Sequence, residues 1–102
     1  MDIFVVYLYC DYRKEVDLQH LKAFKSREEA IDFAKKYAHP EPIEGEYTCI
    51  QGSEYDAKFF SPDEDNENYE EMNKKYEEMK KELKVKPGMW YMRIAVDKVK
   101  LN

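Results

Sequence analysis

The chain is poor in the residues that break or cross-link a fold. Its 102 residues include two cysteines, three glycines and four prolines. So few glycines and prolines exclude a collagen-like or low-complexity chain. Cys10 and Cys49 are too few and too far apart for the disulfide framework of a small secreted domain, and neither belongs to a C-x-x-C pair. We therefore expect two buried thiols in a protein of a reducing, intracellular compartment.

Signals for export or membrane insertion are also missing. The longest apolar run covers residues 3–10, which is far short of the roughly 20 apolar residues that span a bilayer. A secretory signal needs a basic start and a small-residue cleavage site, and here Asp2 follows directly after Met1. We expect no association with membranes.

Charge is abundant, but its balance is not that of a nucleic-acid-binding surface. The chain has 17 Lys and Arg against 22 Asp and Glu, which gives a net charge of −5 at pH 7. This acidic balance argues against direct binding to phosphates. Hydrophobic residues make up 43% of the chain, enough for one small core, and the length fits a single domain over residues 1–102.

Hydrophobic patterning predicts strands at both ends of the sequence. Residues 3–10 are apolar on both alternating faces, which is typical of a central strand, and residues 18–24 complete a hairpin with it. Residues 47–50 and 55–60 are shorter strand candidates. An apolar and a more polar set alternate over residues 89–99, which predicts a half-exposed last strand. The apolar set is Trp90, Met92, Ile94 and Val96, and the other is Tyr91, Arg93, Ala95 and Asp97.

A capping box predicts the first helix. Ser26 precedes Glu29 by three residues, so its hydroxyl can accept a hydrogen bond from the Glu29 backbone N–H. Apolar residues at helical spacing follow as far as Ala38, and His39 and Pro40 are expected to end the helix.

A second capping box predicts a longer helix. The sequence Ser-Pro-Asp-Glu at residues 61–64 places a proline at the first helical position. It predicts a helix over residues 62–84, within a long, charged, amphipathic segment over residues 61–86. Acidic residues begin this segment and lysines end it, which complements a helix dipole. Its narrow apolar stripe consists of Tyr69, Met72, Tyr76, Met79 and Leu83.

The order of predicted elements is therefore β-β-α-β-(β)-α-β. This order is typical of an α+β fold, here a two-layer sandwich with a mostly antiparallel sheet of three to five strands. Two helices are expected on one face of the sheet, the second of them long and charged.

The charges are unevenly distributed along the chain. Residues 51–71 contain eight acidic residues against one lysine, whereas residues 72–102 contain nine basic residues against four acidic ones. The segregation can simply complement the dipole of a solvated helix, or it can form a docking surface for a basic partner. On the second interpretation the partner-binding candidates are Asp63, Glu64, Asp65, Glu67, Tyr69, Met72, Tyr76 and Met79.

No motif indicates catalysis, a metal or a cofactor. The possible zinc ligands Cys10, His20, His39 and Cys49 do not have the close spacings of a zinc site, and the three glycines are isolated. The acidic residues after Pro62 lack the spaced ligands and central glycine of a calcium loop. We predict no catalytic, metal or cofactor-binding residues and no small-molecule substrate.

The nine tyrosines are a different signal. A tyrosine has an apolar body and a polar tip, which suits partly buried surfaces and interfaces. The first candidates for such a role are Tyr7, Tyr9, Tyr12, Tyr69 and Tyr76.

The first 38 residues resemble a group of viral proteins. The sequence V-V-Y-L-Y-C-D-Y at residues 5–12, followed by L-K-A-F-K-S-R-E-E-A-I-D-F-A-K-K-Y at residues 21–37, is similar to the start of small uncharacterised proteins of tailed phages and large DNA viruses. Those proteins share a hairpin that leads into a capped helix. This chain lacks their usual glycine in the hairpin turn and carries residues 41–86 in addition. The resemblance implies a viral accessory or virion protein, in the host cytoplasm or the virion, and no catalytic residues.

Three hypotheses for the function follow. The first is a non-catalytic module that binds another protein or a second copy of itself. The second is an acidic mimic of nucleic acid that inhibits a nucleic-acid-binding protein, for which neutralising Asp63, Glu64, Asp65 and Glu67 is the test. The third is a small enzyme, for which Cys49 and His20 are the best available pair. We expect no direct binding of nucleic acid.

Overall fold

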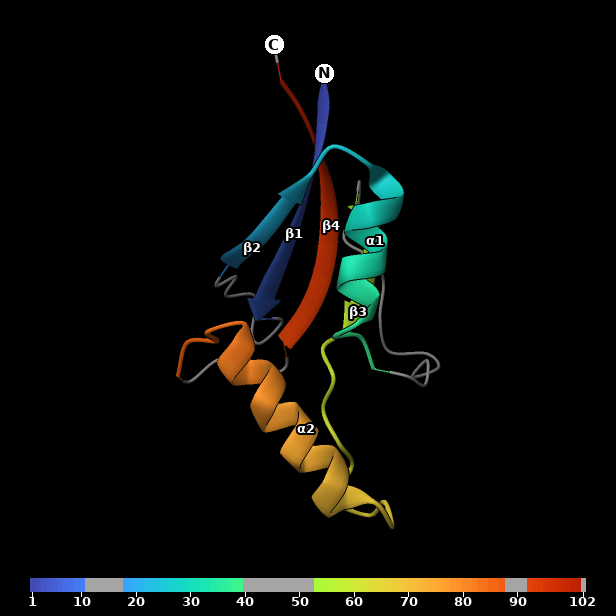
Figure 1. The fold of residues 1–102 in the computed structure, drawn as a ribbon, viewed down its shortest axis with the longest axis vertical. Helices are drawn as coiled ribbons and strands as arrows, with labels where there is room; N and C mark the ends of the chain where they lie inside the picture. Colours follow the sequence, from blue (N-terminus) through green and yellow to red (C-terminus); the bar gives the residue numbers. More distant parts are fainter. Residues whose placement is uncertain (11–17, 40–52, 88–91, 102) are drawn as a thin grey trace.

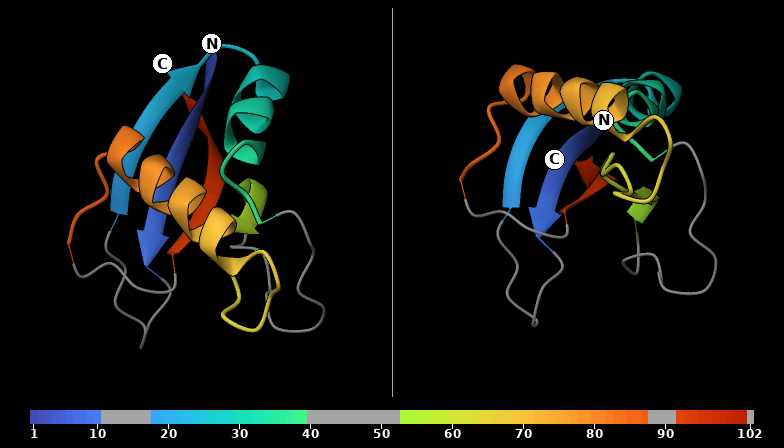
Figure 2. Two further views of the ribbon diagram at one scale, coloured as in Figure 1. Left: turned by 60° about the horizontal axis from the view of Figure 1, so that its bottom comes forward. Right: turned by 90° about the horizontal axis from the view of Figure 1, so that it is seen from below.

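The computed structural model describes residues 1–10, 18–39, 53–87 and 92–101. Its elements follow in the order β1 (Asp2–Cys10), β2 (Leu18–Phe24), α1 (Arg27–Lys35), β3 (Ser53–Lys58), α2 (Tyr69–Glu82) and β4 (Met92–Lys100). The four strands form one antiparallel sheet in the order β2-β1-β4-β3. Both helices lie over the same face of this sheet (Figures 1 and 2). The structure therefore confirms the predicted two-layer α+β fold.

The first and last strands form the centre of the sheet. β1 and β4 pair in an antiparallel register from Asp2↔Lys100 to Cys10↔Met92. The predicted central position of the first strand is thus confirmed. The predicted half-exposure of the last strand is wrong, because β4 is also an interior strand, and all of its residues from Met92 to Val96 are buried. Trp90 and Tyr91 lie outside the described residues.

The Ser26 cap of the first predicted helix is present as predicted. The hydroxyl oxygen of Ser26 accepts a hydrogen bond from the Glu29 backbone N–H at 3.4 Å, and the hydroxyl donates to the Glu28 carboxylate at 3.1 Å. Ala30 and Ala34 are completely buried, and their small side chains let the helix approach the sheet closely. The helix ends at Lys35, before the predicted stop at His39 and Pro40.

The second helix begins later than predicted, at Tyr69 rather than residue 62. In the turns before it, the Asp63 carboxylate accepts from the Asp65 N–H at 3.3 Å, and the Asn66 side chain accepts from the Asn68 N–H at 2.9 Å. Side chains of Asp and Asn that bond to nearby backbone compete with helix formation. These local bonds explain why the capping-box sequence at residues 61–64 does not start a helix.

The end of α2 has a left-handed cap. Leu83 is the C-cap, and Lys84 after it has a φ of 52°. The Val85 N–H donates to the Lys80 carbonyl at 3.0 Å, and the Lys84 N–H donates to the Lys81 carbonyl at 3.2 Å. This is the Schellman arrangement, in which glycine usually occupies the left-handed position.

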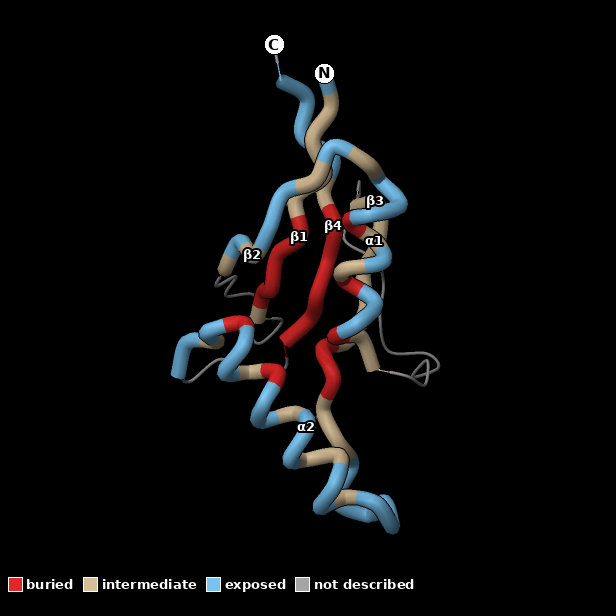
Figure 3. Tube along the Cα trace, in the orientation of Figure 1, coloured by how far each residue is buried: buried red, intermediate tan, exposed pale blue. Residues whose placement is uncertain are grey.

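The main core lies between the sheet and the helices. Figure 3 shows the buried residues concentrated along β1 and β4. The predicted strand over residues 55–60 corresponds to β3, after which Phe59 forms an isolated bridge with Ala38. The predicted strand over residues 47–50 lies outside the described residues. The largest fully buried side chains are Val6, Leu8, Phe59, Ile94 and Val96.

The molecule is elongated, with extents of 49 × 26 × 25 Å. The first half of α2 lies at one end of the long axis, and the outer ends of β1 and β4 lie at the other (Figure 1). Neither described helix has the length and hydropathy needed to cross a bilayer.

Candidate functional site

The predicted acidic residues lie in the turns that precede α2. The side chains of Asp63, Glu64, Asp65 and Glu67 are all exposed, at the end of the molecule where α2 begins (Figures 1 and 3). Since α2 starts at Tyr69, the acidic residues of its first turn are Glu70 and Glu71 instead. The four carboxylates therefore lie before the helix, outside the first turn in which the dipole acts most strongly.

The apolar stripe of α2 is divided between the protein's own core and a half-buried part. Met79 is 6% exposed and belongs to the main core, as does Leu83. Met79 therefore presents almost no surface to a partner, although the sequence predicted it as a partner-binding residue. It is buried because this part of the helix lies over the sheet. Tyr69, Met72 and Tyr76, toward the start of the helix, remain half-buried.

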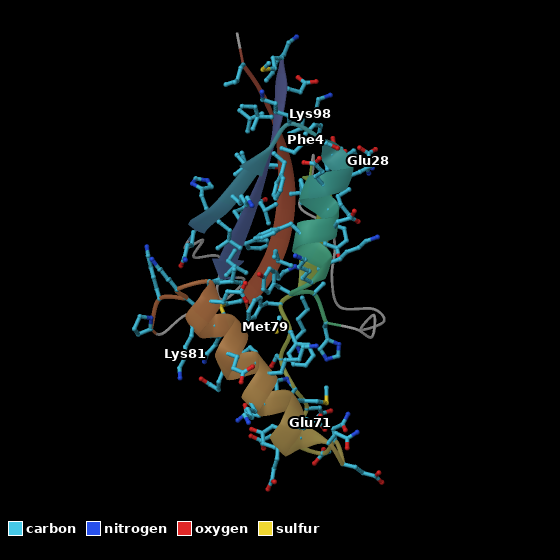
Figure 4. The ribbon with its side chains drawn as sticks, viewed as in Figure 1. Phe4, Glu28, Glu71, Met79, Lys81 and Lys98 are labelled. Atoms are coloured by element: carbon cyan, nitrogen blue, oxygen red, sulfur yellow. The ribbon has the colours of Figure 1, made fainter. Side chains whose placement is uncertain are left out.

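A groove runs beside this half-buried part of α2. It encloses about 470 Å³ and is lined by Phe60, Glu71, Met72, Lys74, Lys75 and Glu78. Phe60 and Met72 are its apolar members, and the Lys75 ammonium lies 5.9 Å from the centre of the Phe60 ring. Figure 4 shows Glu71 on the first half of the helix and Met79 nearer the sheet. An apolar floor with charged groups at its rim is suited to an amphipathic ligand.

A buried polar cluster on the opposite face of the sheet has no counterpart in the sequence predictions. The Tyr9 hydroxyl lies 2.9 Å from both carboxylate oxygens of Asp56 and donates to that carboxylate. The Nε of Arg93 donates to the Tyr9 oxygen and to Asp56, both at 2.9 Å. The side chains of Arg93 and Asp56 are only 4% and 0% exposed. An arginine flanked by Met92 and Ile94 was the available signal, because a charge inside an apolar strand needs a buried partner.

Burial and charge shift the proton equilibria of this cluster. Burial of Tyr7 raises the pKa of its hydroxyl to about 12, with the charges of Asp97 and Asp56 adding to the effect. Burial also raises the pKa of Tyr9, as do its hydrogen bond to Asp56 and the charge of Asp56. Burial works against the charge of Arg93, but its hydrogen bond to Asp56 and the Asp56 charge outweigh burial, so the pKa of Arg93 is raised. The cluster thus favours neutral tyrosines beside a charged arginine.

A second cleft joins β2 to both helices. It encloses about 340 Å³, and Gln19, Tyr37 and Glu82 are among its lining residues. The Gln19 side-chain amide donates to the carbonyls of Leu83 and Lys84 at 2.9 and 3.1 Å. The Tyr37 hydroxyl donates to Glu82 at 3.0 Å. These bonds tie the end of α2 to β2 and to the turn after α1, so this cleft has a structural role.

The residues considered for metal binding or catalysis are scattered. Cys10 is half-buried rather than buried as expected, and Cys49 lies outside the described residues, as does Tyr12. His20 is exposed, with its ring edge-on to Tyr7 at 6.4 Å. His39 stacks on Phe60 instead, at 5.9 Å between ring centres. Within residues 1–10, 18–39, 53–87 and 92–101, no three His, Cys, Asp or Glu side chains gather as a metal site would require.

Comparison with known proteins gives no relative: no protein-family model, no curated protein and no solved structure matches the chain.

Proposed function

We propose that the protein is a non-catalytic interaction module that binds a basic, amphipathic segment of another protein at the first half of α2. The observation that supports this proposal is the groove of Phe60 and Met72 beside a group of exposed carboxylates. The resemblance of residues 1–38 to viral proteins supports a place for the module among small viral accessory or virion components.

The acidic residues before the helix favour a basic partner, since in the groove itself Glu71 and Glu78 balance Lys74 and Lys75. Asp63, Glu64, Asp65 and Glu67 are exposed and precede the helix, so their charges are available to a ligand that approaches along the groove. Complementary charges increase the association rate and the specificity of a complex more than its affinity. The apolar contact with Met72, which is half-buried beside the buried Phe60, would supply the affinity, as apolar anchors do in helix-in-groove complexes.

The proposal is tested with a fluorescent helical peptide of leucine and lysine that carries its leucines along one face. Fluorescence anisotropy measures its affinity for the protein. Neutralising all four residues, as Asp63→Asn, Glu64→Gln, Asp65→Asn and Glu67→Gln, should weaken binding by roughly tenfold or more at low salt, since 1.4 kcal/mol is tenfold. Raising the salt concentration should weaken the binding of the unaltered protein to a similar extent, because salt screens exposed charges.

The matched control neutralises exposed acids on the other helix, as Glu29→Gln and Asp32→Asn, and should leave the affinity unchanged. An affinity that survives the fourfold neutralisation, or that high salt does not reduce, would overturn the proposal.

The second candidate is the acidic mimic of nucleic acid, favoured by the same exposed carboxylates. The groove separates the two functions, because a mimic of a phosphate backbone acts through charge and needs no apolar anchor. Met72→Ser should weaken binding of the peptide but leave competition with DNA for a DNA-binding protein unchanged. The mimic would be favoured if the unaltered protein competes with DNA but does not bind the peptide, and if the fourfold neutralised protein no longer competes with DNA.

A further inference from the structure

The charged residues that line the α2 groove are available to a ligand. Glu71, Lys74, Lys75 and Glu78 are all exposed. Glu71 and Lys75 are four residues apart, as are Lys74 and Glu78, yet no ion pair joins any of these four side chains to another described residue. Elsewhere on the same helix, Lys80 does pair with a glutamate, at 3.4 Å. The groove thus has charges of both signs that the protein does not use for itself.

The sign of the charge changes along the groove. At its start lie the four exposed carboxylates that precede α2, to which Glu71 in the first turn of the helix adds another. Lys74 and Lys75 follow about one turn later, and Glu78 another turn later. At a rise of about 1.5 Å per residue, Glu71 and Glu78 lie roughly 10 Å apart along the helix axis. A ligand that matches this order has most of its positive charge at one end and an acidic residue about one turn further along.

The stability of a helical ligand decides which of its ends is the basic one. Basic residues stabilise a helix in its last turn and acidic residues do so before it, because they complement the helix dipole. α2 itself has this order, with Glu70 and Glu71 in its first turn and Lys80 and Lys81 in its last. A ligand helix with the same order places its C-terminal end beside the carboxylates that precede α2. Its lysines carry full charges, which outweigh the partial negative charge of the helix end.

On the basis of the proposed function, we infer that the partner segment is a helix that runs antiparallel to α2. Its last turn is basic and faces the acidic residues before α2, and an acidic residue one turn earlier lies between Lys74 and Lys75. Its apolar side contacts Met72. Direction and charge order go beyond the proposed function, which fixes only the place of the ligand and its overall charge.

The two lysines of the groove then determine specificity. Like charges across an interface suppress wrong partners, so Lys74 and Lys75 disfavour a helix that is basic along its whole length. The Lys75 ammonium lies 5.9 Å from the centre of the Phe60 ring, at the edge of the apolar floor. An acidic residue of the ligand that reaches Lys75 therefore also brings the neighbouring apolar side chains of the ligand to this floor.

Two fluorescent peptides of equal composition test the order of charges. The first is the leucine–lysine helix with one lysine replaced by glutamate, one turn before the last. The second has this glutamate in the last turn instead. The first peptide should bind about two- to fivefold more tightly, the range expected for exposed ion pairs.

A double variant assigns this preference to the groove. Lys74→Gln with Lys75→Gln should remove the difference in affinity between the two peptides. The matched control Lys81→Gln, an exposed lysine of the same helix that does not line the groove, should keep it. A preference that persists in the double variant would come from the peptides themselves and would overturn the inference.

A nitroxide at the C-terminus of the first peptide tests its direction. In the nitrogen-15 correlation spectrum of the bound protein, it should broaden the amide signals of Glu67 and Glu70 and spare that of Lys81. Broadening at Lys81 instead, or equally at both ends of α2, overturns the antiparallel arrangement but leaves the proposed function intact. If neither this peptide nor the leucine–lysine peptide binds, the proposed function fails and the inference fails with it, so the two failures are distinguishable.

Discussion

Neutralising Asp56 should destabilise the protein far more than neutralising Glu54 two residues earlier on the same strand. Both carboxylates pair with the Nε of an arginine at 2.9 Å, Asp56 with Arg93 and Glu54 with Arg27. The two pairs differ in burial. The Arg93 and Asp56 side chains are 4% and 0% exposed, whereas those of Arg27 and Glu54 are 48% and 28% exposed. The comparison therefore sets a buried ion pair, whose carboxylate also accepts from the Tyr9 hydroxyl, against a solvent-screened one.

The expected magnitudes follow from the dielectric response around each pair. At a separation of 2.9 Å, Coulomb attraction is roughly 1.4 kcal/mol in water and roughly 6 kcal/mol at an effective dielectric constant of 20. Asp56→Asn leaves the buried Arg93 charge without its carboxylate, which should cost about 3–5 kcal/mol. Glu54→Gln removes a solvent-screened pair and should cost less than about 1 kcal/mol.

Urea unfolding followed by circular dichroism measures both effects. With a urea dependence of about 1–3 kcal/mol per molar, the loss at Asp56 should lower the unfolding midpoint by roughly 1–5 M, and Glu54→Gln should shift it only slightly. The double variant Asp56→Asn, Arg93→Met should be more stable than the sum of its single variants implies, because the uncompensated charge is gone. Equal losses of stability in Asp56→Asn and Glu54→Gln would refute the reasoning.

Three further predictions concern the tyrosines and the end of α2. Because the folded protein raises the pKa of Tyr7 from 10 to about 12, the stability contributed by its neutral form is fully present below pH 10 and is lost as the pH rises toward 12. Alkaline unfolding should therefore begin in this interval and be shallower in Tyr7→Phe, and a titration of tyrosinate absorbance that showed ordinary ionisation without unfolding would contradict this. Lys84→Gly should stabilise the protein by about 1 kcal/mol, because a residue with a Cβ is strained in the left-handed conformation. Thermal unfolding measures this gain. An equal gain in the nearby control Lys86→Gly would exclude the helix cap as its cause. Gln19→Ala should cost about 1–2 kcal/mol through loss of its two hydrogen bonds and should speed amide exchange at the end of α2, and exchange that stays unchanged there would show that Gln19 does not hold the helix.

The sequence predicted those parts of the fold that depend on local signals. The Ser26 cap and the β1–β2 hairpin each follow from residues within a short window, the two-layer arrangement follows from the order of such elements, and the structure has all three. The start of α2 was wrong because two local signals compete. A capping box at residues 61–64 and side-chain turns at Asp63 and Asn66 favour different backbone conformations of the same short segment, and sequence alone does not rank them.

The partners of Arg93 could not be predicted, because the buried cluster joins three strands that are distant in the sequence. An arginine inside an apolar strand indicates that it needs a buried partner, but only the register of β3 and β1 with β4 brings Asp56 and Tyr9 to it. Of the residues predicted to bind a partner, the acidic ones are exposed as expected, whereas Met79 is buried. Whether a stripe residue belongs to the core depends on where the sheet ends beneath the helix, which is a tertiary property.

The pairing of β1 with β4 also sets the order in which the chain can fold. Strands near opposite ends of the sequence meet in the centre of the sheet, with Asp2 opposite Lys100. The β1–β2 hairpin and α1 can form early from local contacts, but the helices lack half of their apolar platform until Ile94 and Val96 arrive. Contacts of such long sequence separation slow folding. The core can therefore close only after β4 has been synthesised, because until then β1 lacks its pairing partner in the centre of the sheet.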